Sequence, residues 1–324
     1  MRGVGSLLLR LCLLLTLVAA GTYLLLCFSP VDPVRAYIGN DLLHVPPAQQ
    51  ALIARRWGLD QPLWLRFARW AGQALQGEWG YSSLYNAPVR QVIAERLPTS
   101  LGLLAGAWLL SGLGGVALGL LAGRYHGRWP DRLLRRLIYL MACLPTFWVA
   151  LLLLALLAVA WPVLPVCCAW PAGLEAEQAT FTERLRHLIL PLLSLSLIGM
   201  GNVAMHTRER VVEVLASEFV LYARAQGDGG WSLLRGHVLR HALGPALCLQ
   251  FASFGEFIGG SLLAEKVFAY PGLGQASVDA GLRGDIPLLM AVVLLCTLLV
   301  FAGNQLAGWL LHRLNRPLAL PHVA

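Results

Sequence analysis

Hydrophobic residues fall in long runs along the chain, separated by shorter polar stretches. A helix that spans a membrane needs roughly 20 mostly apolar residues, and six runs qualify if brief polar interruptions are allowed. The runs are residues 7–28, 99–123, 133–161, 186–206, 241–264 and 286–312. The fourth is the weakest, because Pro191, Asn202 and His206 interrupt it. The pattern predicts an all-α polytopic membrane protein with six transmembrane helices.

Composition agrees with a membrane protein. Of the 324 residues, 57% are hydrophobic and 13% are charged, whereas a soluble domain of this size needs a larger polar surface. Arg2 and Arg10 precede the first apolar run, as in a secretory signal. That run is long for a signal, however, and no clear small-residue cleavage site follows Cys27. We therefore interpret it as a retained first span.

Arginine placement predicts the orientation of the spans. If both chain termini are cytoplasmic, the arginine-rich segments at 124–136 and 208–240 are cytoplasmic too, which is the positive-inside pattern. The segment 29–98 then lies outside with seven arginines, and long segments cross the membrane largely regardless of charge. The net charge of +8 is thereby explained by topology, and no nucleic-acid partner is expected.

These spans predict the organisation of the chain: an N-terminal span at 1–28, an extracytoplasmic segment at 29–98, a core of five spans at 99–312 and a tail at 313–324. Within 29–98, residues 47–57 and the stretch after Asp60 have helical patterns. The second of these has an aromatic face, which either lies at the membrane interface or packs on the spans.

Glycines mark the second span. Gly115, Gly119 and Gly123 recur every four residues, a spacing that lets helix backbones approach closely in lipid. They do not form a phosphate loop, because that motif needs a lysine after its last glycine and Lys266 is the only lysine in the chain. No nucleotide site, metal site or cofactor is predicted, so any ATP-driven work requires another chain.

A polar segment, "EFVLYARAQGDGGWSLLRGHVLRHALGP" (218–245), lies between the fourth and fifth apolar runs and overlaps the start of the fifth. Residues 208–226 repeat apolar positions at helical spacing. A glycine-rich turn from Gly227 follows, and then a second short helical stretch from Trp231 to Leu239. Two short helices joined by a flexible turn would make a projecting knob that a partner can grip. An ordinary loop at the lipid surface is the alternative.

The residues "ARAQG" (223–227), followed eighteen positions later by Pro245, resemble the permease signature of binding-protein-dependent ABC importers. The stretch is most similar to the dipeptide, oligopeptide and nickel branch, in its first-permease type. Further motifs of that branch follow in order: "SPVDP" (29–33), "GLDQPLW" (58–64), "GEWGYS" (77–82), "ERLPTSL" (95–101), "LPTFW" (144–148), "RHLILP" (186–191), "EKVFAYPGLG" (265–274) and "RGDIP" (283–287).

The resemblance implies a type I ABC importer permease fold in the bacterial inner membrane, with a cytoplasmic coupling loop at 207–240. It also implies half of a translocation pore for peptides, nickel or a metal chelate of the opine type. The implied partners are a second homologous permease, ATPase subunits that dock on 218–240, and an extracytoplasmic solute-binding protein.

The coupling residues that the resemblance implies are Glu218, Phe219, Tyr222, Ala223, Arg224, Gly227 and Pro245. Phe219 and Tyr222 would be buried anchors in the ATPase cleft, and Arg224 a charged contact there or a contact to lipid phosphate. "GDGG" (227–230) departs from the family pattern, and the extra glycine predicts a softer junction between the two short helices.

Glu256 lies near the middle of the fifth span, where the family usually has a small residue. Intramembrane carboxylates are costly and usually face a cavity, so Glu256 and Asn202 are candidates for the pore. A pore-lining carboxylate would favour cationic or metal-bearing cargo. The alternative is a protonated Glu256 that hydrogen-bonds a neighbouring span, with Asn202, His206 and Asn304 as candidate partners.

The outer turns contain the remaining candidates. Arg283 and Asp285 are expected to be exposed, either contacting the solute-binding protein or forming a salt-bridged turn. Cys167 and Cys168 are adjacent in an outer loop; metal capture or a vicinal disulfide is conceivable, although no CxxC spacing supports a metal site.

Two other function classes compete with the permease. An intramembrane enzyme would need a Ser–His pair, an HExxH zinc motif or two membrane aspartates, and none of these patterns occurs in the sequence. An ion-coupled secondary transporter would use its own membrane carboxylates, for which Glu256 alone is thin support.

Overall fold

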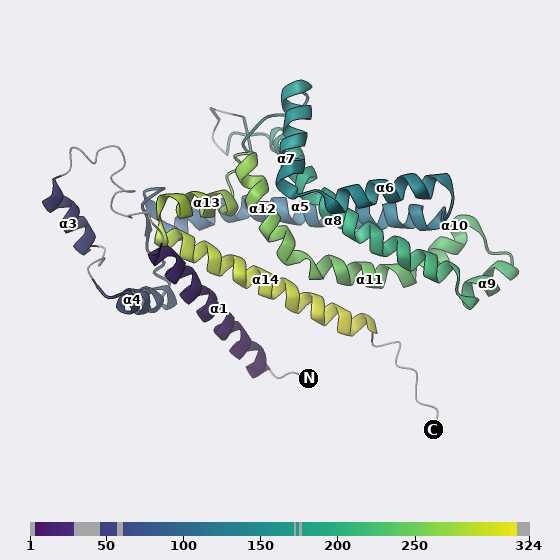
Figure 1. Cartoon of the computed structure of the whole chain (residues 1–324), viewed down its shortest axis with the longest axis horizontal. Helices are drawn as coiled ribbons and strands as arrows, with labels where there is room; N and C mark the ends of the chain where they lie inside the picture. The colour runs from purple at the N-terminus through teal and green to yellow at the C-terminus, as the bar shows by residue number, and fades with distance from the viewer. Residues whose placement is uncertain (1–3, 29–45, 57–60, 172, 175–176, 316–324) are drawn as a thin grey trace. The chain divides into compact units, whose positions relative to one another are not determined.

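The computed structural model describes residues 4–28, 46–56, 61–171, 173–174 and 177–315. These residues are almost wholly helical, with one antiparallel hairpin of strands β1 (Tyr81–Ser82) and β2 (Ala87–Pro88) (Figure 1). The predicted all-α fold is therefore confirmed. The motif at 29–33, the start of the motif at 58–64 and the tail from 316 onward lie outside the described residues.

Within the described residues, four helices are long and apolar enough to cross a membrane, and two bent helix pairs raise the number of candidate spans to six. The four are α1 (Val4–Cys27), α5 (Val89–Arg124), α8 (Phe181–Leu215) and α14 (Ile286–Asn315). The first bent pair is α6 (Trp129–Cys143) with α7 (Thr146–Leu154) and the π-helical η2 (Ala155–Ala160). The second is residues 230–252, which end in α11 (Leu239–Ala252), with α12 (Phe254–Val267).

The third expected span, 133–161, is thus not straight. It bends by 106° between α6 and α7, because Leu144 is extended and Pro145 follows it, and a proline ring disfavours helical backbone at the preceding residue. The fifth expected span bends by 52° at Ser253.

The chain forms two compact units. Unit 1 comprises residues 1–100 and 271–301 and contains α1, α3 (Pro47–Arg56), α4 (Leu63–Leu75), the hairpin, the start of α5, α13 (Leu273–Arg283) and the first half of α14. Buried residues of α5, α13 and α14 make its main core. The aromatic helix α4 packs on α1, since the ring centroids of Phe67 and Tyr23 are 5.3 Å apart. Packing on a span was one of the two arrangements expected from the sequence.

Unit 2 comprises residues 101–270 and 302–324. It contains the remainder of α5 and α14, helices α6 to α8, α9 (Glu218–Ala225), α10 (Gly230–Leu233), the π-helical η3 (Leu234–Val238), α11 and α12. Helix α8 is its centre, since α6, α7, α11 and α12 all pack on it. Thr180 and Glu183 begin α8 with a capping box, in which each side chain accepts a hydrogen bond from the other residue's backbone N–H.

Glycines of α5 allow it to pack tightly against α8. A Cβ at Gly115 would lie 2.6 Å from the Val203 side chain, and one at Gly119 would lie 2.5 Å from Thr207. The predicted close approach is therefore confirmed, and its partner is α8.

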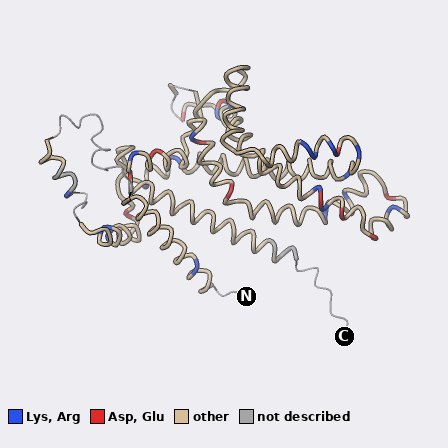
Figure 2. The backbone as a smooth tube through the Cα atoms, in the orientation of Figure 1, with Lys and Arg blue, Asp and Glu red and all other residues tan. Residues whose placement is uncertain are grey.

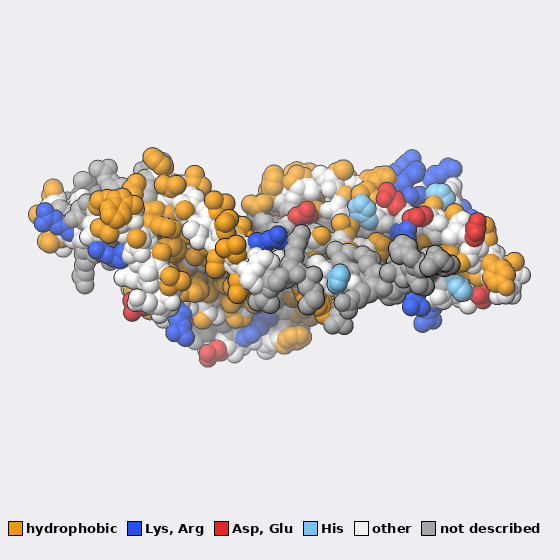
Figure 3. Space-filling model, turned by 90° about the horizontal axis from the view of Figure 1, so that it is seen from below, with side chains coloured by type: hydrophobic (Ala, Val, Ile, Leu, Met, Phe, Trp, Pro, Cys, Tyr) orange, Lys and Arg blue, Asp and Glu red, His pale blue; other side chains and the backbone are white. Residues whose placement is uncertain are grey.

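The surface is suited to lipid over much of its area. Leu13, Leu17 and Leu25 of α1 are each more than three-fifths exposed, and hydrophobic side chains cover much of the face seen in Figure 3. Charged residues of unit 2 gather around the start of α6, the end of α8, and α9 and α10 (Figure 2). That charged end carries the candidate coupling segment.

Candidate functional site

Helix α9 begins directly after α8, once Ala216 and Ser217 have turned the chain. One face of α9 is buried: Val220 is 0% exposed and Ala223 is 5% exposed. These residues join a cluster made by the end of α8, α10, η3 and the start of α11. Burial of this face fixes α9 on the unit instead of leaving it as a loose loop.

The other face of α9 presents aromatic side chains. Phe219 is 45% exposed and Tyr222 is 66% exposed, and Glu218 and Arg224 are exposed beside them. The Phe219 ring lies 5.0 Å from the His241 ring of α11, and Gln226 donates a hydrogen bond to the Tyr222 hydroxyl at 2.9 Å. The structure therefore leaves both predicted anchors accessible to another chain.

The turn after α9 depends on Gly227, whose φ is +101°, a conformation that side chains disfavour. The Asp228 N–H donates to the Ala223 carbonyl at 3.1 Å, which closes the helix end. The Asp228 carboxylate also lies 3.1 Å from Nε2 of His237 in η3. This contact ties the two short helical segments together, so the glycine-rich junction has a brace that sequence reasoning missed.

The knob, which consists of α9, the turn after it, α10 and η3 (residues 218–238), is held at its base by the end of α5. The Arg124 guanidinium lies over the Trp231 ring of α10, 4.4 Å from its centroid, and a cation over an aromatic face is attracted by the ring quadrupole. Leu120, one turn earlier, packs on the buried cluster under α9. The knob thus rests on both α8 and α5.

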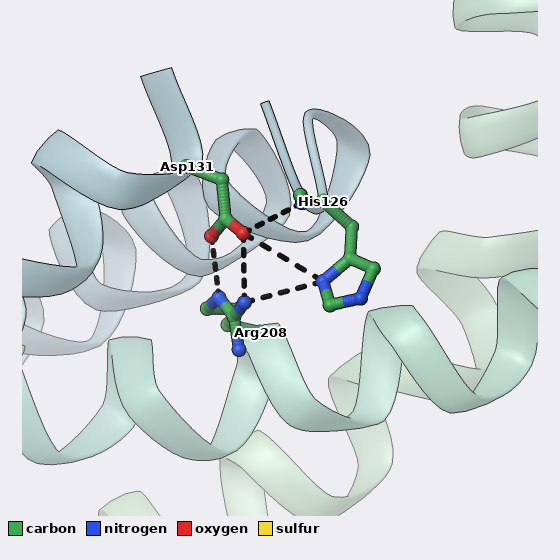
Figure 4. Close-up of polar contacts among 4 residues, drawn as sticks. His126, Asp131 and Arg208 are labelled. Carbon is green, nitrogen blue, oxygen red and sulfur yellow. Dashed lines mark hydrogen bonds and ion pairs between the residues drawn. The ribbon is translucent and has the colours of Figure 1, made fainter. Parts of the chain in front are cut away.

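A buried ion pair joins the start of α6 to α8 near the same end (Figure 4). Nε of Arg208 donates to one oxygen of Asp131 at 2.6 Å and its Nη2 donates to the other at 2.8 Å. Gly127 adds a backbone N–H at 2.9 Å, and Nδ1 of His126 lies 3.6 Å from the carboxylate. Asp131 is only 2% exposed, so its charge is desolvated and fully paired.

Glu256 has the opposite surroundings. It lies in the first turn of α12 and is exposed, whereas the adjacent Phe257 is buried and packs on Gly199 of α8. Within the described residues, the Glu256 carboxylate makes no hydrogen bond and no ion pair. The alternative, a hydrogen bond between Glu256 and Asn202, His206 or Asn304, is therefore absent from the described residues.

Those three candidate partners lie elsewhere. His206 is exposed and pairs with Glu209 of the same helix at 3.8 Å. Asn202 is half-buried on α8 and Asn304 is exposed on α14. Pro245, the last residue of the signature, is exposed within α11.

The expectation that Asp285 is exposed is wrong. Asp285 is 1% exposed, and its carboxylate accepts hydrogen bonds from the Ser82 hydroxyl at 2.6 Å and from the N–H groups of Leu84 and Leu288 at 3.1 and 3.2 Å. It therefore joins the β1–β2 hairpin to the start of α14 within unit 1. Arg283, by contrast, is exposed at the end of α13.

Comparison with known proteins decides the family. Residues 115–319 match the family described as "Binding-protein-dependent transport system inner membrane component". The chain belongs to this family. It is therefore a permease subunit of an ABC importer.

Several known proteins are similar to the permease over nearly its whole length. The glutathione transport system permease protein GsiC of Salmonella paratyphi A is 34% identical over 303 residues, 93% of each chain. A putative peptide transport system permease protein of Brucella abortus is 32% identical over 290 residues, 90% of each chain. The oligopeptide transport system permease protein AppB of Bacillus subtilis is 28% identical over 289 residues, 88% of this chain and 89% of its own.

A solved structure shows the same fold. The permease matches a chain of the MetNI methionine ABC transporter in an inward-facing conformation, with a TM-score of 0.57 and 14% identity. The match covers 70% of this chain and 98% of that chain. The type I ABC importer permease fold implied by the sequence motifs is thereby confirmed.

The adjacent cysteines of the permease lie in the loop after η2, in unit 2. Cys167 and Cys168 are joined as a vicinal disulfide, one of the two conceivable arrangements. The loop is held in place because the Cys168 N–H donates to the Phe268 carbonyl at 2.9 Å and His187 contacts the Cys167 carbonyl at 2.8 Å.

Proposed function

We propose that this permease forms half of an ATP-driven pore that imports small peptides, with both chain termini in the cytoplasm. The arginine distribution supports that orientation, which puts α9 and the turn after it on the cytoplasmic side. The names of its relatives, which refer to glutathione, oligopeptides and peptides, support a peptide cargo. A second homologous permease completes the pore, and separate ATPase subunits hydrolyse ATP. A solute-binding protein delivers the cargo at the outer side, where the exposed Arg283 is a contact residue.

The observation that carries the coupling proposal is the two-sided packing of α9. Its inner face is buried through Val220 and Ala223, while Phe219 and Tyr222 are exposed on its outer face. Large exposed aromatics on a well-anchored helix are the usual hot spots of a protein interface. A helix that fills a cleft and is fixed at its base transmits force, whereas a frayed loop does not.

The remaining residues of the segment have distinct roles in this proposal. Ala223 and Gly227 shape the knob, the first through packing and the second by ending α9. Glu218 and Arg224 provide charged contacts at the rim of the ATPase cleft, and Pro245 lies in the span that the knob moves. Nucleotide-driven closure of the paired ATPases pushes the knobs together, which opens the pore outward.

The test is uptake of labelled tripeptides by proteoliposomes that contain the complete importer. The expected result is uptake that requires ATP and the binding protein, and that the combined Phe219→Ala and Tyr222→Ala changes reduce through weaker ATPase docking, by about 2 kcal/mol or roughly 30-fold in affinity. Phe181→Ala is the matched control, because Phe181 is 80% exposed at the opposite end of α8.

Two outcomes would overturn the proposal. Uptake driven by a proton or sodium gradient without any ATPase would make the protein an ion-coupled transporter. ATP-dependent uptake of Ni²⁺ or of a Ni²⁺–histidine complex, with no peptide uptake, would assign it metal cargo instead.

A further inference from the structure

One carboxylate inside a membrane span has no place in the coupling machinery. Glu256 follows the break at Ser253, where the bent pair turns by 52° between α11 and α12. It occupies the first turn of α12 and is exposed.

The packing of α12 fixes the direction of Glu256. Phe257 is 3% exposed and Ser261 is 3% exposed, on the side that faces the unit, and Gly260 lies so close to Leu195 of α8 that an added Cβ would be 2.8 Å from it. Residues three and four apart share a helix face. The exposed positions of α12 include Glu256, Gly259 and Leu263, which follow one another at this spacing, and Gly260 lies at the edge of their face. The Cβ position of Gly259 has no atom within 4 Å. The face around the carboxylate is therefore open.

An ionised carboxylate on that face is incompatible with lipid. On insertion scales, a carboxylate at the centre of a span costs roughly 2.5–3.5 kcal/mol, and within the described residues nothing pairs with Glu256. A carboxylate that lacks a partner at this depth requires water, which a translocation pathway supplies.

We infer that Glu256 lines the translocation pathway and selects cargo by charge, favouring peptides that carry an ammonium or guanidinium side chain over acidic peptides. This inference rests on the proposed function. Opposite charges a few ångströms apart attract one another even in a hydrated passage lined by protein, so a passing cation is stabilised at the carboxylate and a passing anion is repelled.

The test compares uptake of Ala-Lys-Ala, Ala-Ala-Ala and Ala-Glu-Ala by the complete reconstituted importer. Each rate is divided by the occupancy of the solute-binding protein, measured separately, so that selection at the binding protein does not enter the comparison. We expect Glu256→Gln to lower normalised uptake of the lysine peptide about tenfold, to change the neutral peptide less than about twofold, and to raise the acidic peptide. Glu256→Asp, which keeps the charge, restores the order of the wild-type rates.

The other outcomes separate the two proposals. Equal changes for all three peptides, or none, would overturn the charge-selection role while leaving ATP-driven peptide import intact. Absence of ATP-dependent uptake of any peptide by the wild-type importer would instead overturn the proposed function itself.

Discussion

Asp131 and Glu256 are both carboxylates of unit 2, yet the protein treats them in opposite ways. Asp131 is buried and receives two bonds from Arg208 and one from Gly127. Glu256 is exposed and has no partner among the described residues. A carboxylate whose every oxygen is satisfied within its own chain is part of the framework. One that lacks partners in an apolar span is available for another molecule, and the difference predicts how each responds to mutation.

The largest effect is expected from Arg208→Ala. Removing one partner of a buried ion pair leaves an uncompensated charge on Asp131, which costs about 3–5 kcal/mol of unfolding free energy. Thermal unfolding of the detergent-solubilised permease measures the loss. The matched control is Arg210→Ala, two residues along α8, because Arg210 pairs with the exposed Glu213 at 2.6 Å and exposed pairs contribute about 0–1 kcal/mol. Equal losses for the two variants would refute a structural role for Asp131.

A loss comparable to that of Arg208→Ala is expected from Asp285→Ala in unit 1. The change leaves the Ser82 hydroxyl and the N–H groups of Leu84 and Leu288 without their acceptor, and each orphaned buried group costs about 1–3 kcal/mol. The same unfolding measurement on Arg283→Ala serves as control, since an exposed substitution usually stays within about 0.5 kcal/mol. If Arg283→Ala proved the more destabilising, Asp285 would not be the tie between the hairpin and α14.

His237→Ala tests the brace across the glycine-rich turn. The contact with Asp228 is partly exposed, so its loss should cost no more than about 1 kcal/mol. The local consequence is faster amide hydrogen exchange at residues 227–230, with α8 unchanged. Unaltered exchange in the turn would mean that the contact does not stiffen it.

Glu256→Gln is expected to have the smallest effect on stability. Because no partner within the chain is lost, the unfolding free energy should stay within about 0.5 kcal/mol of the wild type, in contrast to Arg208→Ala. A loss comparable to that of Arg208→Ala would show that Glu256, like Asp131, stabilises the fold, and would refute the contrast between the two carboxylates.

Sequence reasoning located the features that are written in local patterns. Apolar runs gave the spans, and the spacing of Gly115, Gly119 and Gly123 predicted close helix packing, although not that α8 was the partner. The bend after Leu144 had a signal in Pro145 that the hydrophobic run concealed. The bend at Ser253 has no proline, so the signal that marks the first bend is missing there.

The contacts that were missed join residues far apart in the chain. Asp131 and Arg208 are separated by 77 positions, and Asp285 bonds Ser82 across 203. An aspartate in a turn is expected to be exposed unless its distant hydrogen-bond donors are known, which is why the prediction for Asp285 was wrong. The predicted coupling residues could be named because they lie in one short segment, where a motif and a helical pattern coincide; their role in docking stays a prediction.

The account depends most on the exposed face of α9. The most direct measurement replaces Tyr222 with a photo-cross-linking phenylalanine analogue in the assembled importer and identifies the captured subunit after illumination. Placing the same analogue at Phe181 is the control. The account predicts that the ATPase subunit is captured from position 222 and not from position 181. Equal capture from both positions, or capture of lipid alone from position 222, would contradict it.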